Sequence, residues 1–396
     1  MNRFLSLTVF LALSMAAPAT GAAPAAAPPG KPAAGTARPR PWEPRERVKI
    51  RDKSGYCIEC HREKTPGLFR SWVEGPHARI GVGCNDCHGA SPSDKDAFLH
   101  QQRFYITTAV TPFDCARCHP DAIRDFYNSG HAEARIRLEK MGPDDPRYPL
   151  VAPYRDGGFA ECAGCHGARV RLDEDRRPGL GTWPNAGIGR LNPDGSRGNC
   201  AACHPAHRFA AEDARRPEAC LGCHDGPDYP EGAIYLHSPH GRVAGMGRAR
   251  DDLSRPGFFC DTTRYEGPTC GLCHFNGAGR DLVTRHNPAW RLTRDLLHPE
   301  APEKGRPEDL RGNMDRVCQQ CHAASVVKRF FASADEKLAR YQSETVRPRL
   351  AGFRKRLKHA RGKKRRRLLE EYGAFLREAK AFRLNLYMGV HGRSGR

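Results

Sequence analysis

The apolar residues of this 396-residue chain follow a helical period over one long stretch near the C-terminus. Between residues 333 and 386 they recur mostly three or four positions apart or in adjacent pairs, as residues on one face of an α-helix do. The members of this pattern are Leu338, Tyr341, Leu350, Phe353, Leu357, Leu368, Leu369, Tyr372, Phe375, Leu376 and Phe382. Pro348 interrupts it, because proline lacks the N–H that a helix interior needs. The pattern predicts two long helices that pack on the body of the protein or on a neighbouring subunit.

The rest of the chain lacks long periodic segments. Residues 47–130 contain short amphipathic pieces, such as DAIRDFYNSGH, separated by loops with glycine and proline. Residues 131–199 contain prolines and a Gly-Gly pair that end any long element, among them Pro143, Pro146, Pro149, Pro153, Gly157 and Gly158. The predicted fold class is therefore mostly α, with extensive loops and long C-terminal helices.

The first residues have the pattern of a secretory signal peptide. Asn2 and Arg3 precede an apolar run over residues 4–17, and small residues follow at about positions 19–23, where cleavage would fall. We predict that residues 1–22 are this signal and that the Ala/Pro-rich residues 23–46 are a linker. No apolar run is long enough to span a bilayer, so a soluble, periplasmic protein is expected.

Cysteine spacing is the strongest chemical signal in the sequence. Of the 17 cysteines, 16 form eight CxxC pairs, and a histidine follows every pair. CxxCH attaches c-type haem: the two thiols form thioethers to the porphyrin, and the histidine becomes the proximal iron ligand. Zinc ribbons and disulfide frameworks require no histidine after each pair. The eight motifs are Cys57/Cys60/His61, Cys84/Cys87/His88, Cys115/Cys118/His119, Cys162/Cys165/His166, Cys200/Cys203/His204, Cys220/Cys223/His224, Cys270/Cys273/His274 and Cys318/Cys321/His322.

Eight covalently bound haem c groups would also supply much of the core. Their flat apolar surfaces substitute for side chains in a chain whose hydrophobic fraction is only 39%. Residues 47–330 are expected to form the octahaem domain of a multihaem cytochrome c, and residues 331–396 a C-terminal helical region. Cys260 belongs to no motif and matches no site pattern in FFCDTT, so we expect a free or partner-facing thiol.

The formal net charge of +20 has an explanation in the same cofactors. Each haem carries two propionates, and arginine is the natural partner of a carboxylate, so no nucleic-acid partner is predicted. Residues 354–367, RKRLKHARGKKRRR, lie beyond the last motif and need another explanation. A solvated helix face is favoured, and docking to an acidic redox partner or to anionic lipid is the alternative.

Histidines outside the motifs are candidate distal ligands. The chain has 18 histidines, and the eight proximal ones leave ten. Seven stand in small-residue or turn contexts that could hold an imidazole against iron, a number that would leave one haem open to substrate. The selection rests partly on the family resemblance described next. These seven are His77, His100, His131, His207, His240, His286 and His391.

The segments WPNAGIGRLNPDGSRGNCAACHPAHRF, ARRPEACLGCHDGPD, SPHG and PTCGLCH carry a family resemblance. Over about residues 50–330 the chain resembles the octahaem hydroxylamine oxidoreductases in the number, order and spacing of its motifs. Members of that family are mostly helical, stack their haems so that electrons pass between them, and are often trimeric. The resemblance makes a homotrimer a candidate assembly.

The resemblance also implies a catalytic site at the fourth haem, that of Cys162, Cys165 and His166. In the family this haem lacks a distal ligand, and an Asp-His pair lies over it. Asp228 matches the aspartate, and Tyr229 stands where the family has histidine. A carboxylate beside a buried haem would be a general base with a raised pKa, whereas tyrosine donates a hydrogen bond but is a poor base. From the local sequence alone, GPDYP makes Asp228 a turn cap.

A C-terminal YMGVHG has a counterpart in oxidising members of the family. There a tyrosine four residues before a ligand histidine crosslinks to the catalytic haem of a neighbouring subunit. The resemblance therefore implies a crosslinking Tyr387 and a ligand His391. The alternative for Tyr387 is an ordinary packing residue near a helix end.

The sequence thus predicts a periplasmic octahaem oxidoreductase that oxidises hydroxylamine or a related small nitrogen compound. Electrons would leave through the other haems to a soluble or membrane-anchored redox partner, a cytochrome or a quinone-linked protein. One alternative is a reductase of nitrite, nitric oxide or hydroxylamine. Another is a pure electron-transfer cytochrome in which all eight irons have two axial ligands.

Overall fold

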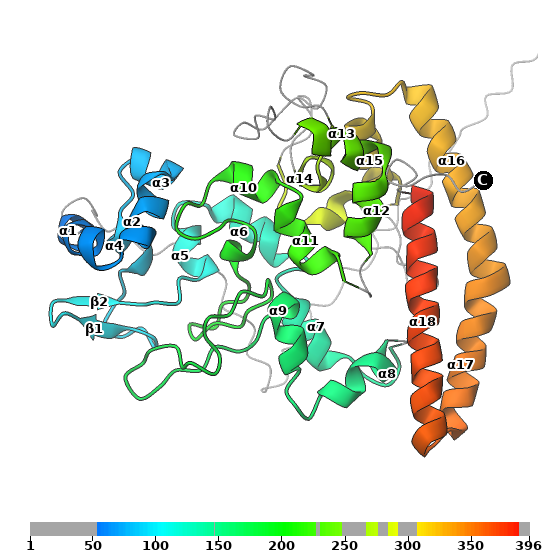
Figure 1. Ribbon diagram of the computed structural model, residues 1–396, viewed down its shortest axis with the longest axis horizontal. Helices are drawn as coiled ribbons and strands as arrows, with labels where there is room; N and C mark the ends of the chain where they lie inside the picture. The colour runs from blue at the N-terminus through cyan, green and yellow to red at the C-terminus, as the bar shows by residue number, and fades with distance from the viewer. Residues whose placement is uncertain are drawn as a thin grey trace, which may run out of the picture. The chain divides into compact units, whose positions relative to one another are not determined.

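A computed structural model describes residues 54–145, 147–226, 230–247, 267–275, 284–291 and 307–387 (Figure 1). The chain divides into two compact units, Met1–Pro41 and Trp42–Arg396, and every described residue belongs to the second. The predicted signal and linker, Asp228, Tyr229, Cys260 and His391 lie outside the described residues.

In the described residues up to 291, most elements are short helices joined by loops, which confirms the mostly helical class. A single two-stranded antiparallel sheet is present in the described part, with Leu99 opposite Tyr105. The strands are β1 (Phe98–His100) and β2 (Phe104–Ile106). The α-helices are α1 (Ser54–Lys64), α2 (Pro66–Val73), α3 (Pro76–Arg79), α4 (Cys84–His88), α5 (Pro112–Ala116), α6 (Pro120–Tyr127), α7 (Ala134–Lys140), α8 (Tyr148–Val151), α9 (Ala163–His166), α10 (Ala211–Arg215), α11 (Glu218–His224), α12 (Glu231–His237), α13 (Pro239–Gly247) and α14 (Cys270–His274). Four 3₁₀ turns are η1 (Ala152–Tyr154), η2 (Ala160–Cys162), η3 (Cys200–Ala202) and η4 (Pro288–Arg291).

Capping side chains start several of the helical turns that carry CxxCH. Thr269 accepts a hydrogen bond from Leu272 N at 3.3 Å, and Asn199 accepts one from Ala201 N at 3.1 Å. Each cap stands directly before the first cysteine of a motif. One helical turn then brings the first cysteine, the second cysteine and the histidine to one side of the backbone, because residues three and four apart are neighbours on a helix.

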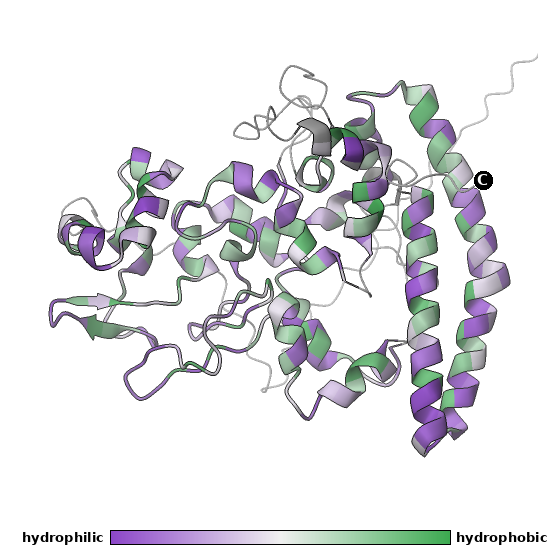
Figure 2. Ribbon diagram, in the orientation of Figure 1, coloured by the Kyte–Doolittle hydropathy of each residue, from purple (hydrophilic) through white to green (hydrophobic). Residues whose placement is uncertain are grey.

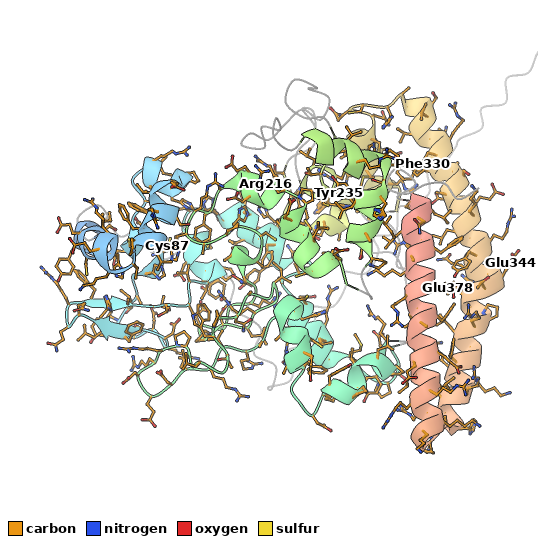
Figure 3. All side chains as sticks on the ribbon, in the orientation of Figure 1. Cys87, Arg216, Tyr235, Phe330, Glu344 and Glu378 are labelled. Carbon is orange, nitrogen blue, oxygen red and sulfur yellow. The ribbon has the colours of Figure 1, made fainter. Side chains whose placement is uncertain are left out.

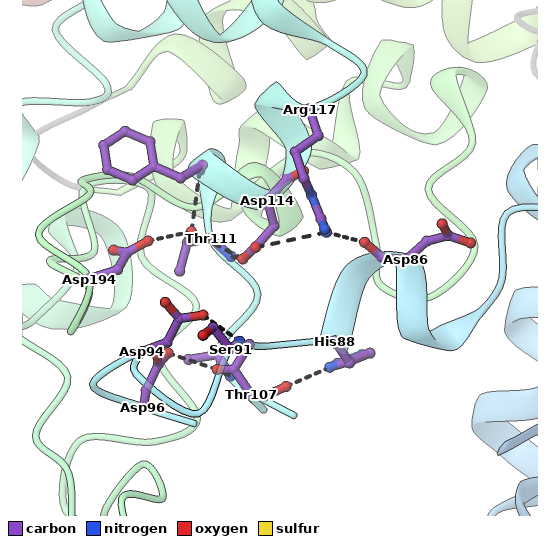
Figure 4. A network of polar contacts seen from close by, with 12 residues as sticks. Asp86, His88, Ser91, Asp94, Asp96, Thr107, Thr111, Asp114, Arg117 and Asp194 are labelled. Atoms are coloured by element: carbon purple, nitrogen blue, oxygen red, sulfur yellow. Dashed lines mark hydrogen bonds and ion pairs between the residues drawn. The ribbon is translucent and has the colours of Figure 1, made fainter. Parts of the chain in front are cut away.

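Thr111 connects one such helix to a distant loop (Figure 4). Its hydroxyl caps α5 by accepting from Phe113 N at 3.2 Å, and it lies 2.8 Å from a carboxylate oxygen of Asp194. The Asp114 carboxylate accepts from the Thr111 N–H at 2.9 Å and completes a capping box. The third motif is therefore anchored to the loop that precedes the fifth.

Residues 167–199 contain no helix and are held by buried side-chain hydrogen bonds. Arg190 donates to Val110 O and to Asn192 Oδ1, both at 2.6 Å. Asn192 donates to Ser196 Oγ at 3.0 Å and to Gly198 O at 3.1 Å, and Asn199 donates to Ala186 O at 3.1 Å. These bonds satisfy backbone groups that a buried loop would otherwise leave without partners.

Two glycines in this loop sit where no side chain fits. Gly198 has φ +104°, and a Cβ there would lie 2.3 Å from Phe126 Cε1. A Cβ on Gly187 would lie 2.1 Å from Gly167 N. The loop-rich segment predicted from the sequence is thus a defined structure that requires glycine at these positions.

The C-terminal region is a helical hairpin, with α16 and α17 side by side with α18 (Figure 1). Its elements are α15 (Pro307–Cys318), α16 (Ala324–Tyr341), the π-helix η5 (Gln342–Val346), α17 (Arg347–His359) and α18 (Gly362–Tyr387). The predicted interruption at Pro348 is wrong, because a π-helical turn precedes it and places Pro348 in the first turn of α17, where a missing N–H is tolerated. The predicted pair of long helices is confirmed.

The hairpin has its own apolar core and also contacts the body of the protein. Leu338, Val346, Tyr372 and Phe375 are almost completely buried within it. On its other side α18 packs against α8 and α12. The end of the hairpin where α17 meets α18 is hydrophilic (Figure 2), and most of the basic side chains in residues 354–367 are exposed there. Figure 3 labels Glu344, in η5, and Glu378, in α18, on the two antiparallel arms of the hairpin.

None of the described helices is both long enough and apolar enough to cross a membrane.

Candidate haem sites

Paired histidine rings are the main feature of the candidate sites. Five predicted distal histidines face a proximal histidine, with ring centroids 5.9–6.3 Å apart. An imidazole nitrogen binds a metal at about 2 Å, so two imidazoles on one metal ion have centroids about 6 Å apart. The pairs are His61–His100 (6.2 Å), His77–His119 (6.1 Å), His88–His207 (6.1 Å), His131–His224 (6.3 Å) and His240–His322 (5.9 Å).

His286 is the candidate partner of His204. Burial, and after it the nearby His286, lower the pKa of His204 to about 4, and His286 also lies near His119. The backbone N–H groups of His286 and Asn287 both donate to a carboxylate oxygen of Asp125, the second at 3.1 Å. Asp125 thus fixes the segment that presents His286.

His166, in the fourth motif, differs from these six. Within the described residues no second imidazole contacts its ring. Its Nδ1 donates to Ala134 O at 3.3 Å, and neighbouring Arg135 donates to Gly167 O at 3.1 Å and to Gly158 O at 2.7 Å. The proximal ring is therefore held in place, while the residues predicted for its distal side, Asp228 and Tyr229, lie outside the described part.

His274 is the remaining proximal histidine. Burial, with smaller effects from Arg291 and His224, lowers its pKa to about 4, and its Nδ1 is buried without a hydrogen-bond partner. His391 lies outside the described residues, so its partnership with His274 stays a prediction.

Contacts at Nδ1 hold several proximal rings in the tautomer that leaves Nε2 free to bind a metal. His88 Nδ1 lies 2.8 Å from Thr107 O (Figure 4), and His166 Nδ1 faces Ala134 O. A carbonyl only accepts, so these Nδ1 atoms carry the proton and leave the Nε2 lone pair free for iron. His61 Nδ1 makes a similar contact with Thr65 Oγ1 at 2.9 Å.

Burial keeps these imidazoles neutral, which is the form that binds a metal. It lowers the pKa of His131 to about 4, with a smaller effect of His224. The pKa values of His77, His100, His207, His240 and His286 are also lowered, in each case mainly by burial. The donor set therefore fits haem iron with two axial histidines.

Cysteines of different motifs are neighbours. Cys200 lies close enough to Cys115 to raise its pKa, Cys270 does the same to Cys220, and Cys165 does the same to Cys223. The third motif therefore neighbours the fifth, and the sixth neighbours both the fourth and the seventh. Sequence order alone did not predict these neighbours.

Cys60 and Cys118 depart from the burial expected of residues that bind a cofactor. They are the second cysteines of the first and third motifs, and both are exposed, whereas the first cysteines of these motifs, Cys57 and Cys115, are partly buried. The physical reason is that a thioether joins the sulfur to the edge of a porphyrin, so the protein's own side chains need not cover it. Burial thus gives no support to Cys60 and Cys118 as attachment residues, and their role stays a prediction from the CxxCH spacing.

The eighth motif has a further departure from the prediction. Fifteen motif cysteines are free of disulfides, but Cys321 is disulfide-bonded. A sulfur in a disulfide cannot also form a thioether, so haem attachment at Cys321 requires that this bond is absent.

Tyr387 lies in the last turn of α18. Its hydroxyl donates to Asp335 Oδ1 at 2.5 Å, and Arg311 Cζ lies 5.4 Å from the centre of its ring. These contacts are those of a packing residue within the hairpin. The crosslink to a neighbouring subunit stays a prediction.

Sequence reasoning missed Glu231 and Lys380. Glu231 begins α12, and its Oε1 lies 3.8 Å from His224 Nδ1 and 2.9 Å from Lys380 Nζ. No local pattern marks either residue, because the contact joins segments far apart in the sequence.

Comparison with known proteins agrees with the motifs. Residues 193–344 match the family described as seven times multi-haem cytochrome CxxCH, and residues 114–179 match the cytochrome c554 and c-prime family. A probable nitrite reductase–hydroxylamine oxidoreductase fusion protein of Kuenenia stuttgartiensis is 25% identical over 262 residues, which is 57% of this chain. The match spans only 26% of that relative's length.

Two solved structures also match. A hypothetical multiheme protein has a TM-score of 0.71 at 21% identity, covering 86% of this chain and 90% of its own. The reducing HAO-like protein complex of Kuenenia stuttgartiensis has a TM-score of 0.46 at 21% identity, covering 76% of this chain and 62% of its own. The first of these structures shows that the fold is shared with a multiheme protein. With the CxxCH motifs, the family matches and the fusion-protein relative identify the chain as a multihaem c-type cytochrome similar to hydroxylamine oxidoreductases.

Proposed function

We propose that this chain is a periplasmic octahaem oxidoreductase that oxidises hydroxylamine, or a related small nitrogen compound, at the fourth motif. The observation that carries the proposal is the pairing of the proximal histidines. Five of them face a predicted distal histidine and His204 lies near His286, whereas within the described residues His166 and His274 have no such partner. The predicted ligand His391 is left for His274, which leaves none for His166. A site without a second imidazole is the one available to a substrate.

The same geometry supports a distal ligand for six of the seven remaining haems. We assign His100, His207, His77, His286, His131 and His240 to the motifs of His61, His88, His119, His204, His224 and His322, in that order. His391 would then serve His274. This assignment uses all seven predicted distal histidines and leaves His166 with an open position.

When bound, haem supplies iron that exchanges electrons and that accepts a ligand where an axial position is open. The chain's own residues do the rest. His166 is held through Ala134 O, so its ring keeps one orientation. Asp228 would take protons from the substrate, and Tyr229 would donate a hydrogen bond to it.

The contacts between motifs support a route for electrons. The Cys165–Cys223 contact joins the fourth motif to the sixth, and the Cys220–Cys270 contact joins the sixth to the seventh. Cys203 and Cys220 also interact, which brings in the fifth motif. The residues of the sixth motif would therefore hold a haem between the catalytic site and the fifth and seventh motifs, where it would supply a route for electrons. A cytochrome or quinone-linked protein would be the final partner.

The reverse reaction is the second candidate. The Tyr387 hydroxyl bonds to Asp335 within its own chain, an arrangement that favours a site without the crosslink. Such a site would suit reduction of nitrite, nitric oxide or hydroxylamine. Peptide mapping decides the point: a haem-linked peptide containing Tyr387 supports oxidation, and an unmodified one favours reduction.

The direct test is spectroscopy of the purified holoprotein with carbon monoxide and with hydroxylamine. One carbon-monoxide-binding, high-spin haem per chain is expected. A protein with only low-spin haems that binds no carbon monoxide would be an electron carrier, and both enzyme functions would be rejected.

Substitution of the predicted base tests the chemistry. Asp228→Ala should reduce hydroxylamine turnover at unchanged haem content. Asp173→Ala, in an exposed part of the 167–199 loop, is the matched control. Turnover equal to that of the control would rule out the general-base role.

A further inference from the structure

A carboxylate lies behind the proximal ring of the sixth motif. Glu231 Oε1 is 3.8 Å from His224 Nδ1, a distance too long for a direct hydrogen bond but short for two charged groups. The Glu231 side chain is only 22% exposed, and its Oε2 is buried without a hydrogen-bond partner. The carboxylate is thus held next to the imidazole in a poorly solvated position, where its field is weakly screened.

Other proximal rings have neutral partners at the same atom. At Nδ1, His61 contacts a threonine hydroxyl, and His88 and His166 contact backbone carbonyls. His224 differs from these three rings because a carboxylate lies behind its Nδ1.

Lys380 completes the arrangement from the C-terminal hairpin. Its Nζ lies 2.9 Å from the same Oε1 atom, and its side chain is 24% exposed. At this distance the ammonium group of Lys380 and the Glu231 carboxylate form an ion pair, and Lys380 offsets part of the negative charge of Glu231.

We propose that Glu231 and Lys380 form a charge pair that sets the reduction potential of the sixth haem. Partners of a ligating histidine tune the metal that it binds. A negative charge behind the ring stabilises the more positive ferric state and lowers the potential, and Lys380 moderates this effect. The role of this potential rests on the proposed function. The sixth motif neighbours the fourth, fifth and seventh motifs, so the reduction potential of the sixth haem would govern how electrons leave the catalytic site.

The test is an optical and electron paramagnetic resonance redox titration of the holoprotein. The His131 and His224 rings are inclined by 76°, and nearly perpendicular axial imidazoles give ferric haem a low-spin signal at unusually high g. Among the five histidine pairs with described ring angles, that signal is expected from the sixth haem, and the His77–His119 pair, at 63°, is the one to separate from it.

Glu231→Gln should shift the midpoint of this signal to higher potential, and Lys380→Met should shift it lower. Glu231→Asp, which keeps the charge, should restore most of the original value. Glu378→Gln is the matched control, because it removes an exposed carboxylate on the same helix as Lys380 that pairs with Arg349 and not with a haem ligand; it should shift nothing.

Midpoints that do not move in Glu231→Gln and Lys380→Met would overturn the proposal. If Glu231→Gln does not incorporate haem, the Lys380→Met variant tests the proposal alone: a shift of the midpoint to lower potential supports it, and no shift or a shift to higher potential overturns it. Potentials are measured without substrate, so this outcome is independent of whether the fourth haem binds hydroxylamine.

Discussion

Under the proposed function, a haem between two histidine rings only carries electrons. His207 shows how such a ring is held ready for a metal: its backbone N–H donates to Ser71 Oγ at 3.3 Å, and its buried Nδ1 has no hydrogen-bond partner. The ring faces His88 at 6.1 Å. Removing one such ring should convert a closed haem into an open one.

We predict that His207→Ala adds one carbon-monoxide-binding haem per chain. Alanine leaves the iron bound to His88 without a second ligand and leaves a cavity beside it. Carbon monoxide titration of the reduced holoprotein measures the change. His359→Ala, at an exposed position that ends α17, is the control and should match the unsubstituted protein. An unchanged stoichiometry would remove His207 from the set of ligands.

The buried neutral histidines also predict how stability depends on pH. Burial lowers the pKa of His131, His204 and His274 to about 4 in the folded protein, whereas an unfolded histidine titrates near 6.5. Between these values the unfolded state binds protons that the folded state does not, so stability falls as pH falls from about 6.5 toward 4. Each such histidine contributes about 1.4 kcal/mol per pH unit in that window.

Urea unfolding of the holoprotein at several pH values between 7 and 4.5 checks this sign. Binding to iron strengthens the effect, since the metal also requires the unprotonated ring. Stability that stays constant or increases toward pH 4.5 would contradict the prediction.

At the scale of elements, loops and helices have different sources of order. The 167–199 loop depends on specific side-chain hydrogen bonds, and the hairpin depends on apolar packing. The sequence predicted the hairpin because the spacing of Leu338, Phe353 and Phe375 reports a helix face directly. It did not predict the path of the loop, because Arg190 and Asn192 bond to groups that only the folded chain brings near.

Asn192→Ala should destabilise the folded protein by about 1–3 kcal/mol. The substitution leaves Ser196 Oγ and Gly198 O without the donor that they have now, and a buried polar group without a partner costs free energy of this size. Chemical denaturation monitored by circular dichroism measures it. Asn385→Ala, an exposed asparagine bonded to Ala381 O, should change the free energy of unfolding far less.

Phe375→Ala should cost about 3–5 kcal/mol, the range for removing a buried aromatic ring. Phe375 is 1% exposed and stacks on Phe353 with ring centroids 5.7 Å apart. Val326→Ala on α16, 45% exposed, is the control. Hydrogen exchange over residues 362–387 should increase in the first variant only; equal protection in both would show that the hairpin does not depend on this core.

At the scale of the whole molecule, the fold brings together motifs that are not consecutive in the sequence. The third lies by the fifth and the fourth by the sixth. The motifs and the type of cofactor followed from residue spacing, and the seven candidate distal histidines followed from local context and the family resemblance, whereas the pairing of histidines and the neighbours of each motif depend on long-range folding. Glu231 and Lys380 belong to the same class, since neither has a local signature.

The number of haems bound by the mature chain is a property of the whole molecule. All eight motifs lie in the described residues, and in seven of them both cysteines are free of disulfides. In the eighth, the disulfide at Cys321 competes with thioether formation. Because His240 faces His322 at 5.9 Å, a ligand pair is already in place there, and we predict that haem attaches and that the mature chain carries eight.

Haem per polypeptide, measured by the pyridine haemochrome method, should therefore be eight. Trypsin should release a peptide of residues 317–328 that carries both Cys318 and Cys321 linked to haem. The peptide of residues 265–280, which contains the seventh motif, is the internal control for complete recovery. Seven haems, together with a disulfide-linked 317–328 peptide, would show that the eighth motif is structural and that His240 has no iron to bind.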